Sequence, residues 1–270
     1  MVMGPGPGAP DLAAAKLQKI VRIIAVLTGK SSNFAENTRA MATILNIETS
    51  GAPCSAALTS DGMILAHQED FTGRNHAAAL SDFIKYCLDY GTEHGLKPDA
   101  VAVSLGPGSY TGLRIGLSEA KGLAYALDVP LIGVKTLELL ATRVMFSTDS
   151  VDPDSILIPM VDARRMEVYT GAYDFGLSEL MTPGAMILDE NSYASLKATG
   201  RPILYFGSGA EKAQPFMEGA TYVEGVEALA VDMVALAELA YNRRQFIDTA
   251  YSVPVYLKEF QATTPKNKVI

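Results

Sequence analysis

A glycine-rich segment at residues 106–116 has the residue types and spacing of a phosphate-binding turn. It lies between an apolar run at residues 100–105, expected to be a buried strand, and a segment of helical period. Glycine permits the positive φ that a sharp turn requires, and the first turn of a helix offers amide groups to an anion. A tight turn without a ligand is the plainer interpretation. The candidate phosphate-binding residues are Gly106, Gly108, Ser109, Thr111 and Gly112.

The helix predicted after this turn, to about residue 127, has two unlike faces. Small residues recur at every fourth position on one face, at Gly112, Gly116, Ala120 and Ala124. Because glycine inside a helix costs about 1 kcal/mol relative to alanine, close packing or a closely bound ligand should compensate. Arg114 and Lys121 fall on the other face, which we expect to be exposed or to contact a partner.

Phosphoryl transfer would also need a carboxylate that holds a metal ion. Glu48 and Asp162 are the candidates, because each lies in a predicted turn after an apolar strand-like run. With the glycine-rich segment, the candidate turns are residues 48–51, which include Glu48, residues 162–165, which include Asp162, and residues 207–209. Structural turns without a ligand are the alternative interpretation of all of them.

Hydrolytic chemistry has little support in the sequence. The chain has three histidines, His67, His76 and His94, and no two stand four residues apart, as a helical metal-binding pair would. His76 and His94 lie near opposite ends of one predicted helix, about 27 Å apart at ~1.5 Å per residue. There is no Gly-x-Ser-x-Gly turn, and neither cysteine has a histidine near it in sequence.

A second candidate surface lies on the helix predicted for residues 76–93. Its polar side chains gather on one narrow side, whereas its apolar arc is roughly twice the ~100° that packing on a single core requires. This excess predicts a protein interface, unless other elements of the same lobe cover both flanks. The candidate interface residues are Leu80, Phe83, Ile84, Tyr86, Cys87 and Tyr90, together with Arg114 and Lys121.

Composition limits the compartment and the partners. The 270 residues include only two cysteines and no apolar run long enough to cross a membrane, so we expect a cytoplasmic protein that contacts no membrane. The formal net charge of −8 argues against a stand-alone nucleic-acid binder.

The order of predicted elements begins again after a linker near residue 150. Each half runs from strands into helices, which predicts an α/β protein with a duplicated two-lobe fold. We expect a leader or extension at 1–40, a first lobe at 41–148, a second lobe at 149–258 and a C-terminal tail at 259–270.

Four segments resemble one protein family. They are residues 44–50 (ILNIETS), 106–124 (GPGSYTGLRIGLSEAKGLA), 162–169 (DARRMEVY) and 254–258 (PVYLK), and they are similar to the TsaB family, also called YeaZ. Glu48 departs from the aspartate that most such chains carry.

The resemblance implies an actin/Hsp70/sugar-kinase-like (ASKHA) fold and a role in making tRNA threonylcarbamoyladenosine. It implies a non-catalytic subunit that supports the transferase TsaD, with the ATPase TsaE as a further partner, and a homodimer in isolation. Contact with tRNA would come only through the complex, and so would any ATP or ADP. The alternative is an enzyme acting alone, either an ASKHA-type kinase or a metal-dependent, glycoprotease-like hydrolase.

Overall fold

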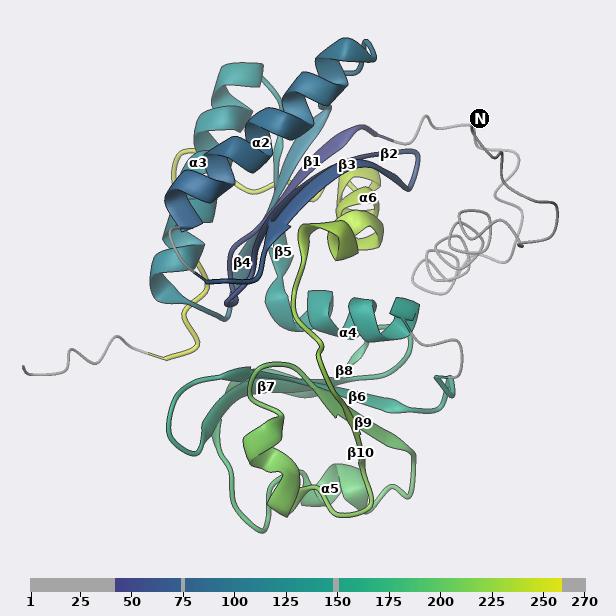
Figure 1. The fold of residues 1–270 in the computed structure, drawn as a ribbon. Helices are drawn as coiled ribbons and strands as arrows, with labels where there is room; N and C mark the ends of the chain where they lie inside the picture. Colours follow the sequence, from purple (N-terminus) through teal and green to yellow (C-terminus); the bar gives the residue numbers. More distant parts are fainter. Residues whose placement is uncertain (1–41, 74–75, 148–150, 259–270) are drawn as a thin grey trace, which may run out of the picture.

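The computed structural model of the chain describes residues 42–73, 76–147 and 151–258. Two five-stranded sheets lie one above the other, each with helices of its own (Figure 1). The predicted duplicated α/β fold is therefore confirmed. None of the described helices is long and apolar enough to span a membrane.

The first sheet has the strand order β3-β2-β1-β4-β5. Strands β1, β4 and β5 are parallel, while β2 and β3 continue the sheet as antiparallel strands. Every residue of β1 is buried, as expected of a central strand covered on both faces. The strands are β1 (Ile44–Glu48), β2 (Cys54–Ser60), β3 (Met63–Asp70), β4 (Ala100–Gly106) and β5 (Leu131–Lys135).

Helices cover both faces of this sheet. On one face lie α2 (His76–Glu93) and α3 (Tyr110–Leu127), which run side by side in Figure 1. The other face is covered by α4 (Thr136–Ser147), which lies between the two sheets, and by the short helix η3 (Ala230–Met233) with α6 (Val234–Asn242). Each face therefore has its own apolar core.

The second sheet has the strand order β10-β9-β6-β7-β8. Its side away from α4 is covered by two short helices, α5 (Ala194–Lys197) and η2 (Glu211–Phe216). The strands are β6 (Ile156–Asp162), β7 (Glu167–Tyr173), β8 (Glu179–Ile187), β9 (Ile203–Phe206) and β10 (Thr221–Val223).

The end of the chain does not follow the expected lobes. The second lobe was expected to span residues 149–258, yet η3 and α6 pack on the first sheet, against β1, β2 and β5. The chain therefore crosses from one lobe to the other twice. The expected leader at 1–40 and tail at 259–270 lie outside the described residues.

Candidate functional site

The glycine-rich turn joins β4 to α3 and is held from within the protein. Gly106 has φ +110°, and Ser109 is the N-cap of α3. The Ser109 amide donates to the carbonyl oxygen of Ser50 at 2.7 Å, and the Gly112 amide donates to the Ser109 hydroxyl at 3.2 Å. Two amides of this turn therefore already have acceptors.

Close packing explains the glycines of this turn and of α3. A Cβ at Gly108 would overlap the carbonyl oxygen of Ser50, and one at Gly112 would overlap that of Thr49. A Cβ at Gly116 would overlap the Thr49 hydroxyl. The row of small residues thus lets α3 approach the loop after β1, and phosphate binding at this turn stays a prediction.

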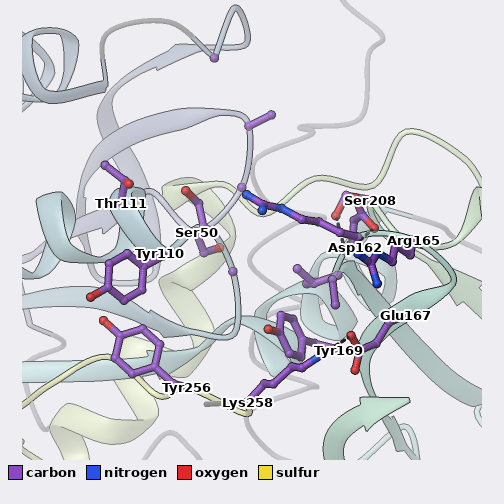
Figure 2. Close-up of a pocket in the computed structure, with 18 residues that line it drawn as sticks. Ser50, Tyr110, Thr111, Asp162, Arg165, Glu167, Tyr169, Ser208, Tyr256 and Lys258 are labelled. Carbon is purple, nitrogen blue, oxygen red and sulfur yellow. Dashed lines mark hydrogen bonds and ion pairs between the residues drawn. The ribbon is translucent and has the colours of Figure 1, made fainter. Parts of the chain in front are cut away.

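A cleft of about 1050 Å³ lies between the two lobes. In Figure 2, Tyr110 and Tyr256 stand together on one wall, and Asp162 and Arg165 project from the other. The polar and aromatic residues that line it include Ser50, Ser109, Tyr110, Thr111, Asp162, Arg164, Arg165, Glu167, Tyr169, Ser208, Tyr256 and Lys258. Among the candidate phosphate-binding residues, Gly108, Ser109 and Thr111 lie at the cleft, whereas Gly106 and Gly112 are buried behind it.

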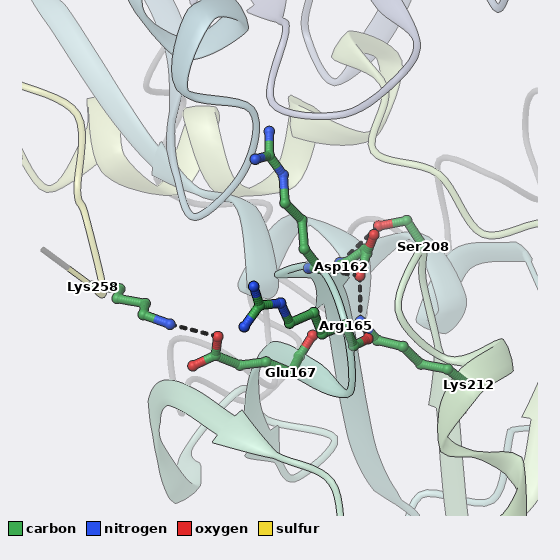
Figure 3. A network of polar contacts seen from close by, with 7 residues as sticks. Asp162, Arg165, Glu167, Ser208, Lys212 and Lys258 are labelled. Atoms are coloured by element: carbon green, nitrogen blue, oxygen red, sulfur yellow. Dashed lines mark hydrogen bonds and ion pairs between the residues drawn. The ribbon is translucent and has the colours of Figure 1, made fainter. Parts of the chain in front are cut away.

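The turn between β6 and β7 is clamped by Lys212. The Lys212 ammonium pairs with the Asp162 carboxylate and donates to the carbonyl oxygens of Arg165 at 2.9 Å and Glu167 at 2.6 Å (Figure 3). The same carboxylate oxygen, Oδ1, also accepts a hydrogen bond from the Arg164 amide at 3.0 Å. The contacts of Lys212 and of the Arg164 amide therefore fix the position of this turn.

Two consecutive arginines stand at the tip of this turn in a left-handed backbone conformation. Arg164 has φ 70° and Arg165 has φ 52°. A residue other than glycine costs of order 1 kcal/mol in that region. Within the described part of the chain, neither guanidinium forms an ion pair or a side-chain hydrogen bond. Both side chains line the cleft.

The C-terminal segment connects the walls of the cleft. The Val255 amide donates to the carbonyl oxygen of Leu105 at 2.7 Å, and the ring of Tyr256 lies 5.3 Å from that of Tyr110. The Lys258 ammonium then pairs with the Glu167 carboxylate of the second lobe at 2.7 Å. Residues 255–258 thus contact both lobes at the cleft.

The two candidate metal-holding acids have different surroundings. Asp162 lines the cleft and is paired with Lys212. Glu48 is fully buried and accepts a hydrogen bond from the Ser50 amide. Burial raises the pKa of Glu48 to about 6, and the nearby hydroxyls of Ser50 and Ser104 offset part of that rise. Across the described residues there is no cluster of three or more metal-ligating side chains.

The interface predicted on α2 is wrong for three of its residues. Leu80, Ile84 and Cys87 are buried in the core of the first lobe, because α3, β2 and β3 cover the flanks of the helix. Phe83 and Tyr90 are half-buried against the same core. A partner of this chain therefore cannot contact the three buried side chains while this fold is intact.

Other residues near α2 and α3 remain accessible. Tyr86 of α2 is 48% exposed, and on α3 Tyr125 is 85% exposed and Leu127 40% exposed. Arg114 is exposed and lies over the ring of Tyr110 at 4.9 Å. Lys121 is half-buried and donates to the carbonyl oxygen of Ala250 at 3.0 Å, so it contacts the part of the chain that leads to residues 255–258.

The two lobes, the cleft between them and the glycine-rich turn define a protein of the actin/Hsp70/sugar-kinase-like class. A family model described as TsaD, tRNA N6-adenosine threonylcarbamoyltransferase, matches residues 67–259. The tRNA threonylcarbamoyladenosine biosynthesis protein TsaB of Bacillus subtilis is 30% identical over 225 residues, covering 82% of this chain and 96% of the relative. TsaB of Escherichia coli is 28% identical over 223 residues, covering 80% and 94%.

A solved structure agrees with these relatives. YeaZ from Pseudomonas aeruginosa superposes with a TM-score of 0.67 at 26% identity, covering 80% of this chain and 100% of that one. The chain belongs to the TsaB (YeaZ) family.

Proposed function

We propose that this chain acts in tRNA threonylcarbamoyladenosine biosynthesis as a subunit that binds and supports a TsaD-type transferase. The observation that carries the proposal is the match to relatives named for this biosynthesis, which spans 96% of the length of the Bacillus subtilis protein. The family model described as a threonylcarbamoyltransferase supports the same pathway. We include a TsaE-type ATPase in the assembly, with ATP or ADP entering through it.

A non-catalytic role fits the way the cleft is occupied by the chain itself. Asp162 is neutralised by Lys212, and Glu48 is enclosed in the first lobe. The amides of Ser109 and Gly112, which a phosphate would need, donate to acceptors within the chain. The Asp162 carboxylate and these two amides therefore already have partners within the chain. ATP hydrolysis by the purified chain alone would instead favour the kinase alternative.

The partner surface we propose is the outer face of α2 and α3. Aromatic side chains are favoured at protein interfaces, and Tyr86 and Tyr125 are exposed there on adjacent helices (Figure 1). The same two helices also carry exposed polar contacts, among them the Lys85–Asp89 ion pair and a 3.1 Å hydrogen bond from Ser81 to Glu119. In isolation, a second copy of the chain would cover the same face.

Replacing Tyr86 with glutamate tests this proposal. A charge at the centre of a desolvated interface should weaken binding of the cognate TsaD-type protein by at least about tenfold, measured by isothermal titration. The melting temperature should hardly change, because Tyr86 is about half exposed. The matched control is Ile187→Glu, which places the same charge on a 72% exposed apolar residue of the second lobe. Equal affinities for Tyr86→Glu and the control would contradict the proposed surface.

A further inference from the structure

The charges around the cleft leave a local positive excess on an acidic protein. Asp162 is paired with Lys212, and Glu167 is paired with Lys258, so these four charges cancel. The guanidinium groups of Arg164 and Arg165 have no acidic partner among the described residues. Two uncompensated positive charges therefore face the cleft of a chain whose formal net charge is −8.

The backbone of the turn gives no local reason for arginine at these two positions. Both residues have a positive φ, a conformation that asparagine and glycine adopt far more readily. Lys212 holds the turn from beneath through main-chain oxygens, and it does so without help from either arginine side chain. The side chains are thus presented to the cleft by a rigid turn, which suits recognition of a ligand outside the chain (Figure 3).

Chemistry on the facing wall indicates the class of ligand. The Arg114 guanidinium lies over the Tyr110 ring at 4.9 Å, and the Tyr256 ring lies 5.3 Å from that of Tyr110 at an interplanar angle of 32°. Tyr256 is 46% exposed, whereas the ring of Tyr110 already contacts Arg114 and Tyr256. Arginine forks suit phosphate oxygens, and exposed aromatic rings suit unpaired bases.

We propose that this cleft binds RNA directly, with Arg164 and Arg165 contacting backbone phosphates and Tyr256, which packs against Tyr110, stacking on an unpaired base. The cleft volume of about 1050 Å³ accommodates one splayed nucleotide and its flanking phosphates. The inference rests on the proposed function, which supplies tRNA as the ligand, and it extends it by giving this chain its own RNA contact.

The test removes both guanidiniums with the double variant Arg164→Asn/Arg165→Gly. Because asparagine and glycine suit a positive φ, its melting temperature should equal or exceed that of the unsubstituted chain. The probe is a fluorescein-labelled hairpin with the sequence of an unmodified tRNA anticodon stem-loop. Its binding is followed by fluorescence anisotropy over a salt series, with the full chain alone and with its TsaD-type partner.

We expect the double variant to bind the hairpin at least about tenfold more weakly at low salt. The slope of log affinity against log salt should fall in magnitude by about 1.4, since each phosphate contact in a single strand contributes roughly 0.7. The control is Arg244→Gly, which removes one arginine at a comparable φ of 55° outside the cleft lining and should leave the affinity unchanged.

Three results would overturn the inference. One is an unchanged affinity in the double variant, and another is no hairpin binding by the unsubstituted chain with or without its partner. The third is displacement of the hairpin by ADP at equal affinity, which would make this a mononucleotide site. Titration of the unsubstituted chain and of the double variant with the TsaD-type protein separates the two proposals. If neither binds this partner, the proposed function is refuted, while the titration of the chain alone with the hairpin still tests RNA binding.

Discussion

Two carboxyl groups buried in the first lobe have raised pKa values. Burial raises the pKa of Glu48 to about 6 and that of Glu238 to about 7. Glu238 lies on α6 and is 1% exposed, and its Oε2 accepts from the Ala42 amide at 3.4 Å. The carboxylates of Asp61 and Asp99 raise the pKa of Glu238 further. Ionisation of such groups therefore opposes folding.

Replacement of Glu238 with glutamine should stabilise the protein in a pH-dependent way. The folded protein holds the Glu238 proton more tightly than the unfolded chain, whose ordinary pKa is 4.5. The favourable contribution of Glu238 is thus complete below pH 4.5 and is lost as the pH rises through about 7. Since one pKa unit corresponds to about 1.4 kcal/mol and the pKa rises from 4.5 to about 7, Glu238→Gln should raise the free energy of unfolding by roughly 3 kcal/mol at pH 8 and by little near pH 4.

Urea unfolding of both proteins across this pH range measures the difference. Glu218→Gln serves as the control, because Glu218 is an exposed glutamate of the second lobe. A stability difference between Glu238→Gln and the unsubstituted chain that stays constant with pH would contradict the assignment of the shift to Glu238.

At the scale of secondary structure, the packing of α3 depends on residues without side chains. Gly116 faces the Thr49 hydroxyl so closely that a methyl group would overlap it, whereas a Cβ at Gly122 would meet nothing within 4 Å. Both glycines lie inside the same helix, so their intrinsic effect on helix stability is the same. Comparing the same substitution at the two positions therefore separates the effect of packing on stability from the effect of helix propensity.

The two alanine variants should shift stability in opposite directions. Gly122→Ala should stabilise the protein by about 1 kcal/mol, because it adds only helix propensity. Gly116→Ala should destabilise it by roughly 1–3 kcal/mol, because α3 must move away from the loop after β1. The midpoints of urea unfolding compare them directly. If Gly116→Ala instead raised the free energy of unfolding, the prediction would be wrong, because the loop after β1 would then accommodate the added methyl group without loss of stability.

Local patterns predicted the elements of this fold well, since they depend on neighbours in sequence. The helix at residues 76–93 has the predicted bounds, and the helix predicted to reach about residue 127 ends at Leu127. β8 was missed because its burial alternates irregularly along an edge strand. The whole apolar arc of α2 was interpreted as an interface, because the sequence does not show that α3 and β3 cover the flanks of this helix.

The same limit applies to the cleft. The Asp162–Arg165 turn was predicted as a candidate site, yet its free charges depend on Lys212, which lies 50 residues away from Asp162 in sequence. The contact between Lys258 and Glu167 spans 91 residues. Such pairings arise only from the packed fold, so the sequence alone indicates the turn and leaves its net charge undetermined.

At the scale of the whole molecule, the first lobe is completed by the end of the chain. Met233 and Ala237, from η3 and α6, belong to the same apolar core as Ile44 and Ile132 of the first sheet. The Ala230 amide donates to the Ser55 hydroxyl at 2.9 Å, which joins η3 to β2. Helical periodicity does not specify which sheet a helix covers, so the lobe boundary expected from the sequence separated η3 and α6 from the core to which they belong.

This arrangement predicts that the chain cut after residue 148 does not fold by itself. Without η3 and α6, one face of the central strands would be exposed to water, and the buried amide and carboxyl partners of those helices would be lost. Circular dichroism of the fragment 1–148 should show no cooperative thermal transition, whereas the complete chain should unfold as one unit because α4 packs between both sheets. Co-expression of 1–148 with 151–270 is the control, since it restores the missing helices without the covalent link. A sigmoidal melt of the isolated fragment would contradict the structural dependence of the first lobe on residues 230–242.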